Sequence, residues 1–203
     1  MDGTLIDSAP TILNTINAVL ADFGIRSSKK IDHSVVGPPL KKIFEEILNE
    51  NQLSRVDSIV DKFKEIYDAK EYKNTKKFDG IEMLLTGLTS RGCKLHIVTN
   101  KRSAPTSSLI KMYNWSSLFQ SVYSLDSFGK QAENKESLIG KMLKEQSIEV
   151  SKACYVGDTV ADGKAAQANN LDYIMVEWGY GQNIGQYKSA ASPGELLNFL
   201  ILD

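Results

Sequence analysis

The sequence predicts a doubly wound, Rossmann-like α/β fold, a parallel sheet with helices on both faces, interrupted by one inserted all-helical segment. From residue 76 to the C-terminus, short apolar runs typical of strands alternate with longer segments of helical periodicity. Strands separated by helices of this length form parallel sheets, because a parallel pair needs a long crossover connection. Residues 10–75 show helical periodicity alone, which indicates a separate helical unit.

Three amphipathic helices are expected in the inserted segment. The first runs from Pro10 to Phe23, with Ser8 as its expected N-cap, and Gly24 ends it. The second begins after a rigid turn at Gly37-Pro38-Pro39 and continues to residue 48. The third covers residues 56–67, where apolar side chains share one face and charged side chains the other.

The remaining chain predicts alternating strands and helices. Helices are expected at 81–90, 104–112, 135–146, 160–168 and 194–200, and strands at 94–98, 121–125, 153–156 and 173–176. We therefore expect residues 1–9 and 76–203 to form the α/β core, and residues 10–75 to form a helical cap.

Composition excludes several classes of protein. A chain of 203 residues, 42% of them hydrophobic, can bury a core of its own. Its 24 basic and 25 acidic side chains leave no excess positive charge for nucleic acid. Apolar runs are too short to span a membrane and no signal peptide is recognised, so we expect a soluble, cytoplasmic protein, monomer or homodimer. Cys93 and Cys154 are expected to be free, buried thiols.

Polar residues that can bind phosphate follow two expected strands. Asp2, Gly3 and Thr4 form a loop in which glycine permits close approach of a ligand to the backbone. Thr99 and Asn100 follow the strand at 94–98 and offer a hydroxyl and an amide to a phosphoryl oxygen. In open α/β sheets such groups gather at the carboxyl ends of the strands, so we expect these residues to share one site.

A pair of carboxylates and a lysine complete the candidate site. Asp158 and Asp162 stand four residues apart across a strand-to-helix turn, and such oxygen ligands suit Mg²⁺. Lys130 or Lys135 could offset the charge of a phosphoryl group. Each residue also has an ordinary explanation: Thr99 as a helix cap, the carboxylates as a cap and a surface acid, the lysines as solvated side chains. Their order and spacing favour a site.

Four motifs carry a resemblance to a known family. In chain order, they are Asp2-Gly3-Thr4-Leu5-Ile6-Asp7-Ser8, Val98-Thr99-Asn100-Lys101, Asn134-Lys135-Glu136-Ser137-Leu138-Ile139 and Gly157-Asp158-Thr159-Val160-Ala161-Asp162. They resemble the motifs of the haloacid-dehalogenase-like hydrolase superfamily, in its phosphoglycolate-phosphatase-like branch with a helical cap. Trp178-Gly179-Tyr180-Gly181 resembles a further segment of that branch. The cap region is similar only in helical character, position and its Gly37-Pro38-Pro39-Leu40 turn.

The resemblance implies Mg²⁺-dependent hydrolysis of a phosphomonoester through a phosphoaspartyl intermediate. Asp2 matches the general acid and base, and its backbone carbonyl would bind the metal. Thr99 and Lys135 would bind the phosphoryl oxygens, and Lys135 is preferred to Lys130 because it starts a helix. Asp158 would bind Mg²⁺, and Asp162 would bind or orient it through water.

Substrate contacts are expected from both core and cap. Gly3, Thr4 and Asn100 are the core candidates, while Gly37, Pro38 and Lys41 are the hypothetical cap residues facing the substrate, with Lys41 alternatively a surface side chain. The substrate is expected to be a small phosphorylated metabolite, and phosphoglycolate is the first candidate. A sugar-phosphate mutase of the same superfamily is an alternative.

The family nucleophile is the first aspartate of Asp-x-Asp-Gly-Thr, and Met1 falls on the x position. The nucleophile is therefore expected one residue before Met1, at the end of the strand that delivers it. We expect Met1 to be an internal methionine of a longer enzyme, and the chain as written to hydrolyse little or nothing. The alternative is a silent relative that binds Mg²⁺ or phosphate without turnover.

Overall fold

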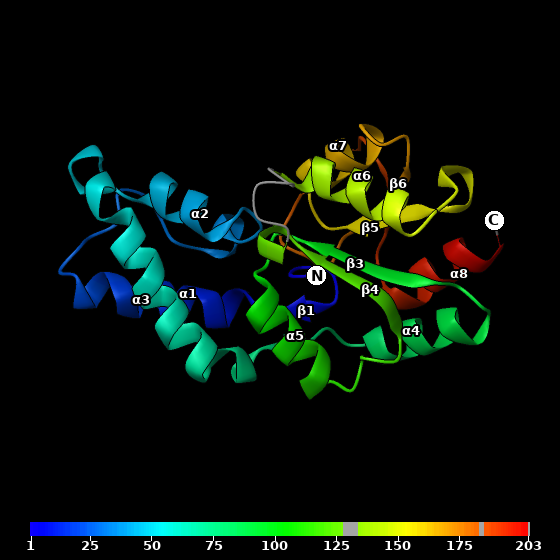
Figure 1. Cartoon of the computed structure of the whole chain (residues 1–203), viewed down its shortest axis with the longest axis horizontal. Helices are drawn as coiled ribbons and strands as arrows, with labels where there is room; N and C mark the ends of the chain where they lie inside the picture. Colours follow the sequence, from blue (N-terminus) through cyan, green and yellow to red (C-terminus); the bar gives the residue numbers. More distant parts are fainter. Residues whose placement is uncertain (128–133, 183–184, 203) are drawn as a thin grey trace.

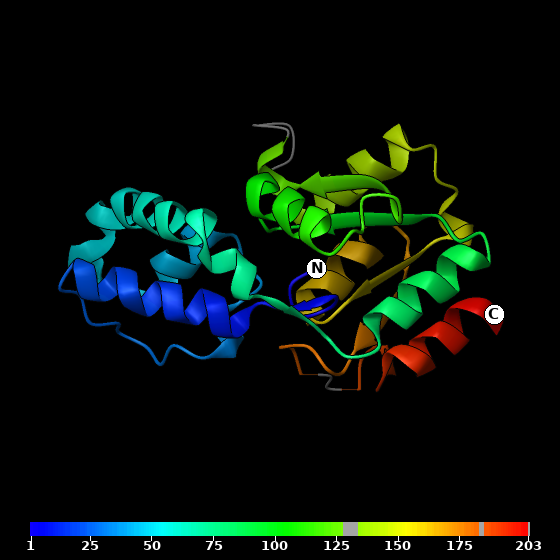
Figure 2. The same ribbon diagram turned by 90° about the horizontal axis from the view of Figure 1, so that it is seen from below.

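The protein folds into two lobes joined by two chain crossings (Figure 1). The computed structural model describes residues 1–127, 134–182 and 185–202. Helices α1, α2 and α3 form the smaller lobe, and the strands and remaining helices form the larger one, which holds both chain ends (Figures 1 and 2). The predicted α/β fold with an inserted helical cap is confirmed.

The smaller lobe has its own hydrophobic core. Its helices are α1 (Ala9–Asp22), α2 (Leu40–Ile47) and α3 (Val56–Ala69), with short 3₁₀ turns η1 (His33–Val35), η2 (Glu50–Arg55) and η3 (Glu71–Asn74). Apolar residues at helical spacing face inward, and the rings of Phe44 and Phe63 meet edge to face with centroids 6.0 Å apart. Tyr180, which belongs to the larger lobe, packs against this core as well.

The larger lobe contains two parallel sheets. Strand β3 (Leu95–Thr99) pairs with β4 (Phe119–Ser124), and β5 (Cys154–Gly157) pairs with β6 (Asp172–Val176), which pairs with β7 (Lys188–Ala190). The Tyr155 hydroxyl on β5 donates a hydrogen bond to the Val98 carbonyl on β3 at 3.1 Å, linking the two sheets. The predicted parallel pairing is confirmed, but β7 was not expected from the sequence.

Helices cover both faces of these sheets. They are α4 (Ile81–Ser90), α5 (Ser103–Met112), α6 (Lys135–Glu145), α7 (Val160–Gln167) and α8 (Pro193–Leu202). Along β6, Ile174 and Val176 pack with α4, α5 and α8, whereas Tyr173 and Met175 pack with α6 and α7. Because side chains alternate across a strand, both faces are apolar and both are covered.

The crossings between the lobes pair with each other. Strand β1 (Ile6–Asp7) is antiparallel to β2 (Lys76–Lys77), with Ile6 opposite Lys77 and Asp7 opposite Lys76. Two-residue strands leave no periodic pattern, so the sequence did not predict them.

Two smaller expectations also meet the structure here. Cys93 and Cys154 are free as predicted, but both are only partly buried. The expected side-chain cap at Ser8 is wrong: Ser8 occupies the N-cap position of α1 but makes no capping hydrogen bond. Within the described residues, no helix combines the length and hydrophobicity needed to cross a lipid bilayer.

Candidate active site

The loop at the start of the chain is tightly wound. The Met1 carbonyl accepts hydrogen bonds from the backbone N–H groups of Thr4, Leu5 and Ile6, at 3.2, 2.8 and 3.2 Å. Gly3 has a φ of +71°, and a Cβ there would lie 2.0 Å from an oxygen of Asp158. Only glycine allows this backbone conformation together with so close an approach of the carboxylate.

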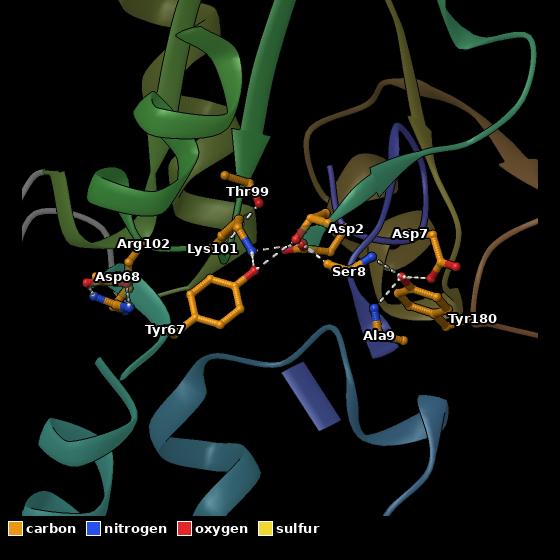
Figure 3. Close-up of polar contacts among 11 residues, drawn as sticks. Asp2, Asp7, Ser8, Ala9, Tyr67, Asp68, Thr99, Lys101, Arg102 and Tyr180 are labelled. Atoms are coloured by element: carbon orange, nitrogen blue, oxygen red, sulfur yellow. Dashed lines mark hydrogen bonds and ion pairs between the residues drawn. The ribbon is translucent and has the colours of Figure 1, made fainter. Parts of the chain in front are cut away.

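The Asp2 carboxylate is held from two sides. Its Oδ1 accepts hydrogen bonds from the Ser8 hydroxyl at 2.6 Å and from the Lys101 ammonium at 3.1 Å. Lys101 Nζ also donates to the hydroxyl of Tyr67, which comes from α3 in the cap, at 3.0 Å (Figure 3). The side chains of Lys101 and Asp2 are only 5% and 14% exposed. The candidate acid and base is thus fixed by one core lysine that also contacts the cap.

Burial and charge oppose each other at this pair. Burial alone would raise the pKa of the Asp2 carboxyl, but the Lys101 charge and the Ser8 hydroxyl lower it below its ordinary value. Burial would likewise lower the pKa of Lys101, yet Asp2 and Tyr67 raise it. Both side chains are therefore charged at neutral pH. A ligand that drew Lys101 away would raise the proton affinity of Asp2.

The turn between β5 and α7 carries the second pair of carboxylates. Asp158 accepts hydrogen bonds from the backbone N–H of Tyr180 at 2.9 Å and from the Thr4 hydroxyl at 3.4 Å. Asp162 sits at the third position of α7, where it forms a capping box with Thr159. Asp162 also accepts a hydrogen bond from the ammonium group of Lys135. The structure thus places Lys135 at this pair, and Lys101 at Asp2.

A cation fits this group of residues. Asp158 is only 4% exposed, and burial raises the pKa of its carboxyl. In the part of the chain that the structure describes, no basic side chain forms an ion pair with Asp158, so a bound cation would relieve the cost of its burial. The described part of the chain holds no group of three or more aspartate, glutamate, histidine or cysteine side chains that could bind a metal ion together. Mg²⁺ suits such a sparse set because it keeps several of its waters.

A small cavity of about 60 Å³ lies between core and cap. Asp2, Asn100 and Lys101 line it from the core, and Gly37 and Pro38 are among the residues lining it from the cap. The Asn100 amide donates to the Gly37 carbonyl at 2.9 Å, while the Asn100 carbonyl oxygen is buried and has no hydrogen-bond partner among the described residues.

The other residues predicted from the sequence lie at various distances from this cavity. Thr99 is buried at the end of β3, where its hydroxyl accepts a hydrogen bond from the Lys101 backbone N–H at 3.1 Å. Lys41 does not line the cavity, and its ammonium group pairs with Asp57 at 2.7 Å on the cap surface. Lys130, the alternative to Lys135, falls outside the described residues.

Sequence reasoning missed three contributors to the site. Lys101 stands inside a recognised motif, directly after the phosphate-binding candidates, and that position was the available signal for its role. Tyr67 and Tyr180 reach the site from a cap helix and from the C-terminal loop, 34 residues from Lys101 and 172 from Ser8. Tyr180 stands in the recognised segment Trp178-Gly179-Tyr180-Gly181, which was the available signal for it, whereas no local pattern marks Tyr67.

An α/β core that gathers carboxylates, lysines and hydroxyls at strand ends, beneath a helical cap, defines a capped hydrolase suited to phosphoryl groups. Residues 1–176 match the haloacid dehalogenase-like hydrolase family, and the chain belongs to that family. The resemblance to its phosphoglycolate-phosphatase-like branch is confirmed, and the enzyme class is that of a phosphatase.

Individual relatives agree with this assignment. A phosphoglycolate phosphatase of Xylella fastidiosa strain 9a5c is 30% identical over 186 residues, which cover 89% of this chain and 79% of the relative. A 5'-nucleotidase of Pseudomonas aeruginosa is 26% identical over 183 residues, covering 89% and 81%. The crystal structure of a predicted phosphatase from Clostridium acetobutylicum superposes with a TM-score of 0.88 at 28% identity, covering 100% and 96%.

Proposed function

We propose that this phosphatase hydrolyses small phosphate monoesters with Mg²⁺ through a phosphoaspartyl intermediate. The observation that carries the proposal is the position of the Asp2 carboxylate. It lines the cavity between core and cap, held by Ser8 and Lys101. Its backbone neighbour Gly3 packs directly against Asp158. The candidate acid and base, the candidate metal-binding carboxylate and the cavity between core and cap are thus neighbours, which supports the proposal.

Each candidate residue has a distinct role in the proposed reaction. Asp2 takes up a proton when the bound substrate draws Lys101 away, and it gives this proton to the leaving oxygen of the substrate. The carboxylate that results then activates the water that releases phosphate. The Thr99 hydroxyl and the Lys135 ammonium bind and neutralise the phosphoryl oxygens. Lys101 orients Asp2 and sets its charge before the substrate enters.

Three residues would hold Mg²⁺. Asp158 and the backbone carbonyl of Asp2 would bind it directly, and Asp162 through water, because Lys135 and Thr159 already engage the Asp162 carboxylate. When bound, the ion offsets the negative charge of the phosphoryl group.

The nucleophile is proposed to be an aspartate one residue before Met1, a position that the printed sequence does not include. The backbone nitrogen of Met1 supports this, because it is buried and the charges acting on it are those of Lys135, Asp2, Asp158 and Asp162. A residue joined to that nitrogen would begin among the groups that bind metal and phosphate.

The proposed substrate is phosphoglycolate, the substrate named for the Xylella fastidiosa relative. Apolar side chains such as Leu40, Ile43 and Phe63 form much of the cap wall of the cavity. The nucleoside monophosphate implied by the name of the Pseudomonas aeruginosa relative is the competing candidate.

The test compares the chain as printed with a form that carries an aspartate before Met1, preceded by a short apolar strand. We expect the extended form to release phosphate from phosphoglycolate in the presence of Mg²⁺, faster than from a nucleoside 5'-monophosphate. Chelation of Mg²⁺, Asp2→Asn, or asparagine in place of the added aspartate should each abolish release. The printed chain should remain inactive.

Other outcomes of the same test would reject the proposal. Isomerisation of a hexose phosphate faster than its hydrolysis would identify a mutase. Binding of Mg²⁺ and phosphate by the extended form with neither product would identify a silent relative. Turnover by a verified 203-residue chain would show that the nucleophile lies elsewhere.

A further inference from the structure

Ser8 has the position of a helix cap without performing that role. As the N-cap residue of α1, its hydroxyl would ordinarily accept a hydrogen bond from a backbone N–H in the first turn. Instead, the Ser8 hydroxyl donates to Asp2 Oδ1 at 2.6 Å. Pro10 lowers the demand for a cap because proline has no N–H group. Something other than the Ser8 side chain must satisfy the remaining N–H groups.

Tyr180 supplies that acceptor from the far end of the chain. Its hydroxyl oxygen accepts hydrogen bonds from the backbone N–H groups of Ser8, at 2.7 Å, and of Ala9, at 2.9 Å. The same hydroxyl donates to Asp7 at 2.9 Å (Figure 3). Ser8 and Ala9 are buried, so water does not replace this acceptor. Tyr180 therefore fixes the residue whose side chain holds Asp2.

The core holds Tyr180 firmly in this position. Its backbone N–H donates to Asp158 at 2.9 Å. A Cβ on Gly179 would lie 2.2 Å from the Asp158 Cβ, and one on Gly181 would lie 2.0 Å from the Asp158 carbonyl oxygen. This packing presses the segment on both sides of Tyr180 against Asp158.

The ring of Tyr180 lies where cap and core meet. Its centroid is 6.4 Å from that of His33 in the cap and 6.5 Å from that of Phe78, which follows the second crossing. It also packs against the hydrophobic core of the cap. Tyr180 thus connects the metal-binding turn with the start of the cap.

We propose that Tyr180 is a positioning residue for Asp2. By capping α1 with its hydroxyl, Tyr180 fixes the Ser8 backbone and leaves the Ser8 hydroxyl free to hold the Asp2 carboxylate. Without the phenol oxygen, the N–H groups of Ser8 and Ala9 lose their acceptor, so residues 7–9 shift and the Ser8 hydroxyl moves away from Asp2. The inference rests on the proposed acid–base role of Asp2.

The kinetic test is a double-mutant cycle, made in the extended form of the protein that carries an aspartate before Met1. Tyr180→Phe and Ser8→Ala should each lower kcat about tenfold with KM changed less than about twofold, since each loosens a group that acts in the transition state. The double variant should be no slower than Ser8→Ala alone, because Tyr180 acts through Ser8. Tyr187→Phe, in the same C-terminal loop, is the matched control and should keep full kcat.

A second readout needs no turnover. In the printed chain, Tyr180→Phe should speed amide hydrogen exchange at Ser8 and Ala9 by about tenfold or more, and leave the amides of α3 unchanged. Ser8→Ala should not expose the amide of Ala9. If no variant turns over substrate, the proposed function fails, and the exchange result still decides the inference. Unchanged exchange, or effects on kcat that multiply in the double variant, would overturn it.

Discussion

Replacement of Lys101 by methionine is the sharpest test of the electrostatics at Asp2. Methionine keeps most of the apolar stem and removes the ammonium group. Asp2 then retains one described side-chain donor, the Ser8 hydroxyl, and Tyr67 loses a hydrogen bond at 3.0 Å. Because both charges are largely buried, the loss of one partner leaves the other uncompensated.

The expected cost follows from two limits. Removing one partner of a buried pair typically costs about 3–5 kcal/mol. The stranded carboxylate can escape by taking up a proton. Protonation of a carboxyl with the ordinary pKa of 3.8 costs about 1.4 kcal/mol for each pH unit above that pKa, or about 4 kcal/mol at pH 7. Lys101→Met should therefore lower the free energy of unfolding by about 3–4 kcal/mol at pH 7.

The effect should depend on pH with a definite sign. In the native chain the lowered pKa of Asp2 contributes stability above the unfolded pKa, and that contribution is lost as the pH falls. In Lys101→Met the carboxyl protonates easily in acid, so the penalty should shrink to less than about 2 kcal/mol at pH 5. Urea unfolding of the printed chain in a chelator, at both pH values, measures the difference.

Two companion variants isolate the charge effect. Adding Asp2→Asn to Lys101→Met should restore most of the lost stability at pH 7, because a neutral amide leaves no unpaired charge. Lys111→Met, on an exposed helix surface, should cost less than about 0.5 kcal/mol. An equal penalty at pH 5 and pH 7, or no recovery in the double variant, would refute the reasoning.

Three further predictions test other parts of the site. Gly3→Ala should weaken Mg²⁺ binding at least about tenfold by calorimetry, because its Cβ would strike Asp158. Gly24 also has a positive φ but open space around it, so Gly24→Ala should leave Mg²⁺ binding unchanged. Burial raises the pKa of Cys154 to about 11. In a Cys93→Ser variant, iodoacetamide should therefore label Cys154 slowly at pH 8 and faster with each higher pH unit. Rapid labelling of the folded protein at pH 8 would contradict this prediction. Arg102 pairs with Asp68 through two hydrogen bonds from its guanidinium to the carboxylate, at 2.6 and 2.5 Å. Arg102→Lys keeps the charge but loses this forked pairing, so limited proteolysis of residues 70–80 should become several-fold faster. An unchanged rate of proteolysis would count against a role of Arg102 in holding the cap closed.

The fold was predictable wherever local chemistry agreed with the final packing. Helix α4 occupies the predicted residues because Gly80, with a φ of +82°, begins it and Gly92, with a φ of +80°, follows its end. Strands β3, β5 and β6 are largely apolar runs packed between helix layers, half-buried along most of β5 and buried along most of β3 and β6. Strand β7 reads Lys188-Ser189-Ala190 and has neither length nor alternation, so only its pairing with β6 defines it.

In the candidate site, too, residues that are close in sequence were predictable, and contacts made by distant residues were not. Asp158 and Asp162 are near in sequence and share one turn, so their spacing alone suggested a metal site. The hydrogen bonds that orient Asp2 were less predictable. Ser8 is close to Asp2 in the chain, but its local pattern indicated a helix cap. That interpretation failed because the acceptor for α1 is a tyrosine 172 residues away. Such a contact depends on tertiary packing, which periodicity does not encode.

The antiparallel pairing of β1 and β2 has a consequence for the architecture of the chain. In topological terms Asp7 and Lys76 are facing residues of a β-hairpin, and residues 8–75 are its loop. Lengthening a loop adds closure entropy only slowly, so a hairpin can accept a folded insert at modest cost. An Asn-Gly turn could join the same two residues directly. The core thus has the connectivity of a self-contained unit into which a different lid could be grafted at a single place.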